Sequence, residues 1–170
     1  ERYQATLWDS VPALMQMLTE YGLSEGKQAL AKHCQMIRVV LMSGDWIPLD
    51  LPAKIWELCG KGTQVIRLGG ATEGSIWSIL YSIDTVCPEW RSIPYGRPMW
   101  NQQFYILNEH QKLQPNGIPG ELYIGGIGVA KGYWEDEERT KKSFINHPKF
   151  GRLYRTGDMG RYQLDGVIEF

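Results

Sequence analysis

One loop of the sequence combines the residue types that can hold a phosphorylated ligand. Residues 69–74 read Gly-Gly-Ala-Thr-Glu-Gly. The glycines allow the backbone to approach a ligand closely, and Thr72 offers a hydroxyl and an N–H group to a phosphate oxygen. Glu73 supplies a carboxylate oxygen of the kind that Mg²⁺ prefers, usually beside phosphate oxygens and water. Taken alone, the same letters are also typical of an ordinary turn, so the loop is a candidate phosphate and magnesium site.

Two further predicted loops also carry polar groups, each next to a predicted strand or hairpin. Ser43-Gly44-Asp45-Trp46 follows a short apolar run, and Tyr154-Arg155-Thr156-Gly157-Asp158 precedes a hairpin signal at Asp165-Gly166. The Asp158 carboxylate could accept both hydroxyls of a ribose. An aspartate after a glycine can equally cap a turn, and that alternative stays open.

The elements before two of these loops form a βαβ pattern. Residues 37–42 and 63–68 are short, β-branched, apolar runs, which predict buried strands. A helix that Asp50 can cap separates them, with four residues mostly on its inner face: Ile55, Trp56, Leu58 and Cys59. Strand, helix and strand at this spacing predict a parallel pair with a right-handed crossover. Ligands bind at the carboxyl ends of such strands, so residues 43–46 and 69–74 are expected at one edge of the sheet.

An earlier segment of the chain predicts another helix. Ser10 stands before Val11-Pro12, and Leu14, Met17, Leu18 and Tyr21 recur at helical spacing before Gly22. The pattern predicts an amphipathic helix that begins at a Ser10 cap and ends at Gly22.

The second half of the chain has a different sequence pattern. Runs 103–107, 120–124 and 166–170 are short apolar segments between Pro, Gly and Asn residues, which predict strands, and one charged helix is expected from Glu135 to about Phe144. The predicted fold is therefore α/β, with the end of a parallel-sheet α/β subdomain over residues 1–92 and a mainly antiparallel β subdomain over residues 93–170.

Composition excludes several functional classes. Eighteen Lys and Arg residues nearly balance nineteen Asp and Glu residues, so no basic stripe points to nucleic acid. Every apolar run is shorter than the ~18 residues that a membrane span needs. Cys34, Cys59 and Cys87 lack paired spacing, and the three histidines lack ligand-like spacing, so we expect buried thiols, no zinc site and a cytoplasmic location. We expect both ends of the chain to lie within a larger protein.

The order of the loops carries a resemblance to a known family. Residues 69–73 are followed by Tyr-Gly-Arg-Pro at 95–98, then by a long Gly-Glu-Leu-Tyr-Ile-containing motif at 117–134, then by residues 154–158. Together they resemble four successive signature motifs of the adenylate-forming enzyme superfamily, specifically the adenylation domains of nonribosomal peptide synthetases. The resemblance covers the whole chain. It implies that residues 1–92 end an α/β subdomain and that residues 93–170 form a β-barrel subdomain.

The resemblance also implies roles for individual residues. Thr72 would contact the α-phosphate of ATP, Glu73 would bind Mg²⁺, and Asp158 would bind the ribose hydroxyls. The remaining nucleotide contacts would come from Gly44, Asp45, Trp46, Gly69, Gly70 and Ala71. The implied reaction is attack of an amino-acid carboxylate on the α-phosphate, with release of pyrophosphate, followed by transfer of the acyl group to the phosphopantetheine thiol of a carrier domain.

At one position the chain departs from the family pattern. The family usually has an aromatic residue, often Tyr, where this chain has Gly69, and that ring stacks on the adenine. Trp46 is the nearest large aromatic surface on a loop that the resemblance places at the base. Trp46 is therefore a candidate for the stacking partner, and a Trp packed into the fold is the alternative.

Six residues match positions that line the amino-acid pocket in the family. They are Asp9, Leu41, Ser43, Leu68, Ile76 and Trp77. The set describes a small, mostly apolar pocket, narrowed by an indole, with a hydroxyl and a carboxylate at its edge. It resembles the pockets of cysteine-activating domains, although those usually have Asn in place of Asp9. The apolar members could instead be ordinary core residues.

Two other functions remain as alternatives. One is an acyl-CoA or aryl-acid ligase of the same superfamily. The other is a non-catalytic scaffold segment. The expected partners are an amino acid, a peptidyl carrier domain and neighbouring synthetase domains of secondary-metabolite biosynthesis, with no nucleic acid and no membrane. The parent protein is expected to be a ligase, and the isolated 170-residue chain is expected to be inactive.

Overall fold

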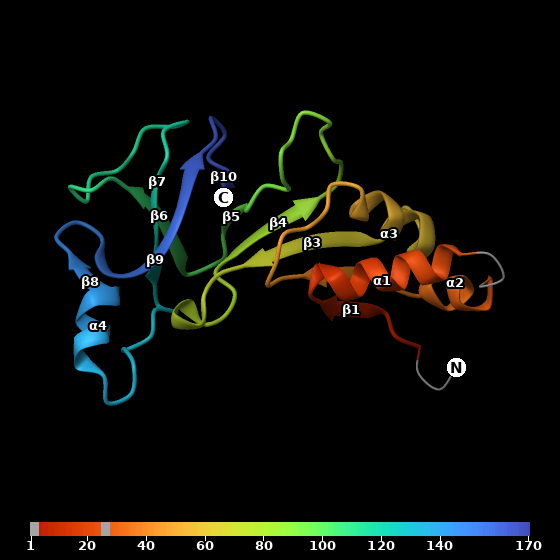
Figure 1. Cartoon of the computed structure of the whole chain (residues 1–170), viewed down its shortest axis with the longest axis horizontal. Helices are drawn as coiled ribbons and strands as arrows, with labels where there is room; N and C mark the ends of the chain where they lie inside the picture. Colours follow the sequence, from red (N-terminus) through yellow and green to blue (C-terminus); the bar gives the residue numbers. More distant parts are fainter. Residues whose placement is uncertain (1–3, 25–27) are drawn as a thin grey trace. The chain divides into compact units, whose positions relative to one another are not determined.

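The computed structural model describes residues 4–24 and 28–170, which form two compact units (Figure 1). The first unit contains the described residues up to Leu68 together with Tyr81–Ile93. The second contains Gly69–Leu80 and Pro94–Phe170. The expected domain boundary after residue 92 stays a prediction, because these units are defined by packing alone.

The first unit is built on a parallel sheet. Its strands β1 (Leu7–Ser10), β2 (Val39–Met42) and β3 (Gln64–Gly69) pair side by side in that order. The helix α3 (Leu51–Cys59) connects β2 to β3, which confirms the predicted βαβ unit. The strand β4 (Ile79–Ile83) follows β3 in the sheet order. Its first two residues belong to the second unit, where they pair antiparallel with β5 (Arg97–Pro98).

Helices cover one face of this parallel sheet. Val40, Met42 and Val65 are buried against Ile55 and Leu58 of α3 in a single apolar cluster. The helices α1 (Pro12–Leu23) and α2 (Gln28–Cys34) complete the layer. Because side chains alternate across a strand, residues 41, 66 and 68 lie on the opposite face.

The predictions for α1 were partly wrong. The residue before the helix is Val11, with no side-chain cap, and the Ser10 hydroxyl instead accepts a hydrogen bond from the Trp8 indole at 2.7 Å. The buried side is formed by Met15, Thr19 and Gly22. A Cβ at Gly22 would lie 2.7 Å from a Leu58 methyl, so this glycine is a close packing point within the helix and not its end.

The predicted apolar face of α1 is largely exposed. Leu14, Met17 and Tyr21 are all more than half exposed. The spacing rule locates an apolar stripe, but within the described residues the helix buries a neighbouring side, on which Gly22 permits a close approach to Leu58.

The second unit is an antiparallel sheet. Its strands lie in the order β10, β9, β7, β6, with β8 paired to the first part of β9. Their bounds are β6 Gln102–Leu107, β7 Gly120–Gly126, β8 Phe144–His147, β9 Gly151–Tyr162 and β10 Ile168–Glu169, and the helix α4 is Glu137–Ser143. The charged helix and the Asp165-Gly166 hairpin are confirmed, since Gly166 has a φ of 83° and Gln163 N–H donates to Val167 O at 2.7 Å.

Two expectations for the second half need correction. The sheet is open and not a closed barrel, because in the described chain β6 and β10 are the two ends of the strand order. Residues 154–158, expected to be a loop, lie within β9. The register of β9 against β7 shifts between Glu121 and Tyr123, and Gly157 has a φ of 84°. A bulge therefore replaces the expected loop and redirects the side chains that follow it.

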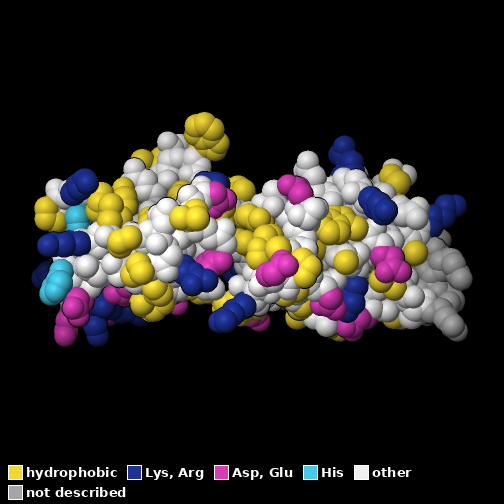
Figure 2. Space-filling model, turned by 90° about the horizontal axis from the view of Figure 1, so that it is seen from above, with side chains coloured by type: hydrophobic (Ala, Val, Ile, Leu, Met, Phe, Trp, Pro, Cys, Tyr) yellow, Lys and Arg dark blue, Asp and Glu magenta, His cyan; other side chains and the backbone are white. Residues whose placement is uncertain are grey.

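The surface agrees with the balanced composition. Figure 2 shows basic and acidic side chains interspersed with apolar ones over the described residues of the face in view. No helix in the described part of the chain combines the length and apolar character that a membrane crossing requires.

Candidate functional site

The loop at the end of β3 is tightly fixed by its own hydrogen bonds. Ser78, which is fully buried, donates from its N–H to Gly69 O and from its hydroxyl to Gly74 O, both at 2.8 Å. Gly70 has a φ of 145°, and a Cβ there would lie 2.6 Å from Ile76 O. Only glycine fits this position, because both the backbone conformation and the space exclude a side chain.

Glu73 lies in the short 3₁₀ turn η1 (Thr72–Gly74) and makes contacts distant in sequence. The Tyr133 hydroxyl donates to Glu73 Oε1 at 2.6 Å, and the Ala130 N–H donates to the Glu73 carbonyl at 2.8 Å. Partial burial tends to raise the pKa of Glu73, but the hydrogen bonds from Tyr133 and the backbone outweigh it and lower the pKa. The carboxylate is therefore held ionised and oriented.

Tyr133 is itself well positioned. Thr140 Oγ1 accepts its N–H at 2.8 Å, the Arg139 guanidinium lies 4.1 Å from its ring centre, and Phe144 packs edge-on at 5.5 Å. Sequence reasoning missed this residue as a member of the site. Tyr133 was seen only as part of a long motif, and no spacing rule links it to a glutamate sixty positions earlier.

The donor chemistry at Glu73 fits magnesium better than a transition metal. Within the residues that the structure describes, no group of three or more His, Cys, Asp or Glu side chains could hold an ion. Mg²⁺ commonly uses one or two carboxylates together with substrate phosphates and water, so a single oriented carboxylate in the candidate phosphate-binding turn suits it.

The residues after this turn adopt an uncommon backbone conformation. Ser75 and Ile76 both have a φ of 66°, which is costly for a β-branched residue. Ser75 donates to Gly128 O at 2.8 Å, and the Ile76 N–H donates to Ala71 O at 3.1 Å. These bonds hold the Ile76 side chain outward, where it is 65% exposed. Strain retained at such a position is typical of a functional loop.

Asp158 lies within the bulge of β9, between the paired residues Arg155 and Met159. Its N–H donates to Thr156 Oγ1 at 3.0 Å, and that hydroxyl donates to Leu122 O at 2.8 Å, so the turn is held to β7. Desolvation by the surrounding chain, and secondarily the Glu121 carboxylate, raise the pKa of Asp158. Glu121 is itself paired with Arg155 at 2.7 Å. Asp158 remains exposed and can accept hydrogen bonds from a ligand.

Four of the predicted pocket residues share one face of the parallel sheet. Asp9 and Leu41 are direct partners in the β1–β2 register, and Ser43 follows Leu41 by two positions. Leu68 follows Ile66, the β3 partner of Leu41, by two positions. This is the face opposite the helices. The other two members, Ile76 and Trp77, belong to the second unit.

The loop after β2 is ordered by a local contact. Gly44 has a φ of 87°, and Asp45 Oδ1 accepts the Trp46 N–H at 2.7 Å. The Trp46 ring is 53% exposed, and the guanidinium of Arg67 lies 5.9 Å from its centre. Arg67 is buried and donates to Ile93 O.

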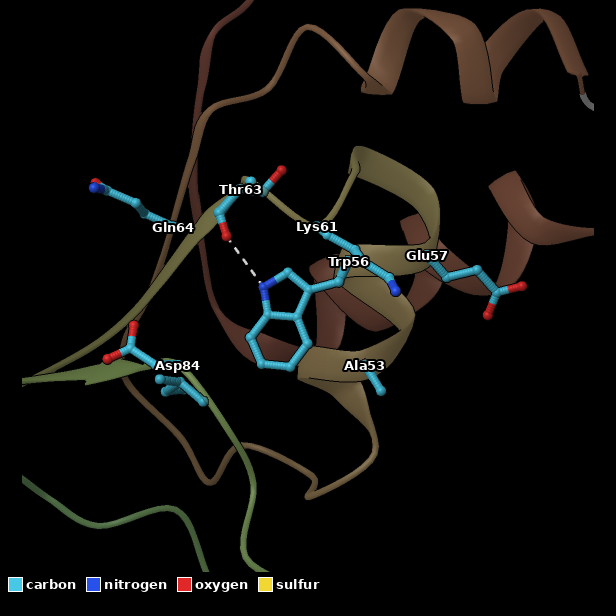
Figure 3. Close-up of a pocket in the computed structure, with 9 residues that line it drawn as sticks. Ala53, Trp56, Glu57, Lys61, Thr63, Gln64 and Asp84 are labelled. Atoms are coloured by element: carbon cyan, nitrogen blue, oxygen red, sulfur yellow. Dashed lines mark hydrogen bonds between the residues drawn. The ribbon is translucent and has the colours of Figure 1, made fainter.

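A cavity of about 650 Å³ lies elsewhere in the first unit (Figure 3). It is lined by Trp56, whose indole donates to Thr63 O at 3.1 Å, and by Ile83, with Glu57 and Asp84 also among its lining residues. Thr63 precedes β3, so this cavity lies at the amino end of that strand. None of the predicted site residues lines it.

None of the three cysteines is among the predicted site residues. Cys34 and Cys59 are buried free thiols, as expected, and Cys87 is partly exposed. Burial raises the pKa of Cys59 to about 12, with a smaller contribution from Cys34, so this thiol stays protonated and unreactive.

Comparisons with known proteins agree with this geometry. Residues 1–134 match the family described as AMP-binding enzyme. The chain is 52% identical over 171 residues to bacitracin synthase 1 of Bacillus licheniformis, covering 100% of this chain and 3% of that protein. It is 45% identical over 170 residues to pyochelin synthetase PchE of Pseudomonas aeruginosa, covering 100% of this chain and 11% of that protein. The chain thus spans a small part of these relatives.

The fold of this chain is also similar to that of a solved nonribosomal peptide synthetase. The nonribosomal peptide synthetase FmoA3, in an AMPPNP-bound form, has a TM-score of 0.91 and 40% identity, covering 98% of this chain and 18% of that one. The same protein has been solved bound to α-methyl-L-serine-AMP. The chain therefore belongs to the AMP-binding enzyme family, in which it corresponds to part of a nonribosomal peptide synthetase adenylation domain.

Proposed function

We propose that the protein containing this chain uses ATP and Mg²⁺ to activate a small amino acid, L-cysteine, as its aminoacyl-adenylate. The observation that carries the proposal is the η1 turn, where the Glu73 carboxylate is held ionised beside Thr72 by Tyr133. A phosphate-binding turn with one oriented carboxylate supplies positioning and charge neutralisation, and this is what phosphoryl chemistry without a covalent protein nucleophile requires.

The residues act on different parts of the nucleotide in this proposal. Thr72 donates to the α-phosphate, Gly70 and Ala71 line the nucleotide, and the exposed Asp158 carboxylate accepts the ribose hydroxyls. Glu73 would hold Mg²⁺, which when bound offsets negative charge on the phosphate oxygens. The amino-acid carboxylate then attacks the α-phosphorus, and pyrophosphate leaves.

A small substrate is favoured by the residues at the pocket positions. Asp9, Leu41, Ser43 and Leu68 share the face of the sheet opposite the helices, and only the first and third are polar. Ile76 and Trp77 are the bulky apolar members of the proposed set. The relative bound to α-methyl-L-serine-AMP supports a short side chain with a polar atom on its β-carbon. L-Cysteine has that size, and its thiol suits a pocket with few hydrogen-bonding groups.

The activated acyl group would pass to the phosphopantetheine thiol of a carrier domain. The similarity to large synthetases supports a carrier domain and neighbouring synthetase domains as partners. A cytoplasmic location is part of the same proposal.

The test is amino-acid-dependent ATP–pyrophosphate exchange by the full-length protein. We expect cysteine to be preferred over serine and alanine, and all three over phenylalanine and lysine, because each misfitting methylene costs about 1–3 kcal/mol. Aryl acids in the same panel separate this function from an aryl-acid ligase. Glu73→Ala should abolish exchange, whereas Glu57→Ala, an exposed glutamate on α3, is the matched control. Preference for phenylalanine, lysine or an aryl acid would refute the substrate assignment.

A further inference from the structure

The space above Gly69 explains why a glycine stands at this position. The φ of Gly69 lies outside the left-handed region, so backbone conformation does not require a glycine. A Cβ at this position, however, would lie 2.7 Å from Cζ and 2.9 Å from the hydroxyl oxygen of Tyr95, with Cε2 closer still. Real Cβ atoms do not approach ring atoms so closely. The Tyr95 ring therefore occupies the volume that a side chain at position 69 would take.

Tyr95 is held in this place from several sides. Its ring stacks on Phe170, with centroids 4.9 Å apart at 23°, and meets the buried Phe104 edge-on at 6.0 Å. Its N–H donates to Ile168 O at 2.8 Å. The residue is nevertheless only partly buried. It is a preorganised aromatic group at the surface, beside the end of β3.

From this arrangement we propose that Tyr95 is the residue that contacts the adenine base, taking the place of a side chain at position 69. The proposal rests on the proposed function, which brings ATP to the loop that follows Gly69. The proposal adds a contact to the adenine base from Tyr95, which lies in the segment before β5 and not in the loop after β3.

The distances along the chain support this assignment. Gly69 is three residues before Thr72, so their Cα atoms are at most about 11 Å apart. One nucleotide can therefore reach from an aromatic ring packed on Gly69 to Thr72, the proposed phosphate contact. Stacking on an aromatic ring is the common way in which proteins bind a base without reading its edges. The two glycines of the loop leave the backbone beside the ring without side chains that would obstruct a flat base.

The steric exclusion between positions 69 and 95 allows a ring-relocation experiment. The full-length protein and four variants would be compared: Tyr95→Leu, Tyr95→Phe, Gly69→Tyr, and the double variant Gly69→Tyr/Tyr95→Leu. Leucine retains apolar packing against Phe104 but removes the ring. Trp100→Ala removes a 96% exposed aromatic side chain of the same unit and is the control for non-specific effects.

We expect Tyr95→Leu to raise the ATP KM and the AMP Kd by about tenfold, which is the scale of one base–aromatic stack. Tyr95→Phe should stay within about twofold of the parent protein, because the stacking ring remains. Gly69→Tyr alone should lower the melting temperature, since two rings compete for one volume. The double variant should recover most of the lost ATP affinity. The KM for pyrophosphate, which has no base, should be unchanged in Tyr95→Leu.

Other outcomes would overturn the proposal. If Tyr95 served packing alone, Tyr95→Leu would weaken pyrophosphate and ATP equally, and the double variant would recover neither. An unchanged ATP KM in Tyr95→Leu, with a rise in Trp46→Ala, would move the base contact to Trp46. Absence of amino-acid-dependent exchange in the parent protein would refute the proposed function instead. The AMP Kd measured by calorimetry would still decide whether Tyr95 contacts the base.

Discussion

At the scale of single residues, the Glu73–Tyr133 hydrogen bond is the contact on which the proposed metal site depends most. A hydrogen bond to a charged group contributes about 1.5–3 kcal/mol, roughly twice a neutral one. Here it also determines the direction of a carboxylate that has only part of its surface exposed. Without the Tyr133 hydroxyl, Glu73 would keep its backbone contact and its hydrogen bond with Tyr154 but lose its strongest orienting side-chain contact.

The first prediction is that Tyr133→Phe weakens the use of magnesium. The ring keeps its packing against Phe144 and Arg139, so the melting temperature should change little. The Mg²⁺ concentration for half-maximal pyrophosphate exchange should rise about tenfold, and Mn²⁺ binding measured by electron paramagnetic resonance should weaken in parallel.

Tyr162→Phe is the matched control for this change. It also removes a hydroxyl from the antiparallel sheet, but that hydroxyl donates to Phe104 O. It should leave the magnesium dependence unchanged. Equal effects of the two variants would show that Tyr133 acts only through the stability of the sheet.

The second prediction concerns the pH dependence of nucleotide binding through Asp158. Its pKa is raised in the folded chain, so the carboxylate is lost at a higher pH than an ordinary aspartate would be. AMP affinity should therefore fall earlier on acidification than for an unperturbed carboxylate, and Asp158→Asn should remove this pH dependence together with most of the affinity. Calorimetric titrations of the full-length protein at a series of pH values would measure both.

The raised pKa of Asp158 affects folding stability in the opposite direction from AMP affinity. A carboxyl group with a raised folded-state pKa binds protons more readily in the folded than in the unfolded chain, so its contribution to stability decreases as pH rises. Asp158→Asn should leave the melting temperature at neutral pH unchanged or higher. A marked fall would show that the ionised Asp158 supports the fold.

At the scale of elements, the loop between β3 and β4 is stabilised by internal backbone bonds and not by regular secondary structure. Ser78 closes it at both ends of the turn, and Gly70 passes directly beneath the Ile76 carbonyl. The outward position of Ile76 follows from this closure. The loop therefore behaves as one structural unit. A displacement of the backbone at Gly70 should also displace Thr72 and Glu73.

The third prediction is that Gly70→Ala disrupts this unit. The added Cβ would meet backbone atoms of Ile76 and Ser78, which cannot move as a side chain can. We expect a loss of about 1–3 kcal/mol in stability and a large loss of exchange activity. Gly62→Ala, where nothing lies within 4 Å of the new Cβ, should change the free energy of unfolding by about 0.5 kcal/mol or less. Chemical denaturation would compare the two, and equal costs would contradict the account of the loop.

At the scale of the whole molecule, the predicted site residues are divided between the two compact units. Asp9, Leu41, Ser43 and Leu68 belong to the first, and Thr72, Glu73, Trp77 and Asp158 belong to the second. The chain also spans only 3% and 11% of the two synthetases compared above. We therefore expect the proposed activity to require more of the protein than these 170 residues.

The fourth prediction is that the isolated 170-residue chain does not catalyse adenylate formation. Losing one preorganised electrostatic donor can reduce a rate about 10²–10³-fold, and groups outside this chain are expected to supply several. Pyrophosphate exchange by the purified chain should be undetectable beside the full-length protein. Robust exchange that Glu73→Ala abolishes would show instead that these residues form a sufficient site.

The sequence by itself determined the features that depend on neighbouring residues. Alternating and β-branched runs predicted β2, β3, β6 and β7, and the spacing between the first two predicted their parallel pairing. The glycine-rich letters of residues 69–74 located the proposed phosphate-binding turn, and the order of the motifs indicated the family. Local conformational preference and periodicity were sufficient for these features.

Only the tertiary structure decided the features that depend on contacts between distant segments. Tyr133 reaches Glu73 across sixty residues, and Tyr95 fills the volume above Gly69, although no local pattern links either pair. The bulge that places Asp158 within β9 arises from a register shift against β7, which the sequence of β9 does not contain. Such contacts are selected by packing and hydrogen bonding in three dimensions, because residues far apart in the chain become neighbours only when the sheets form.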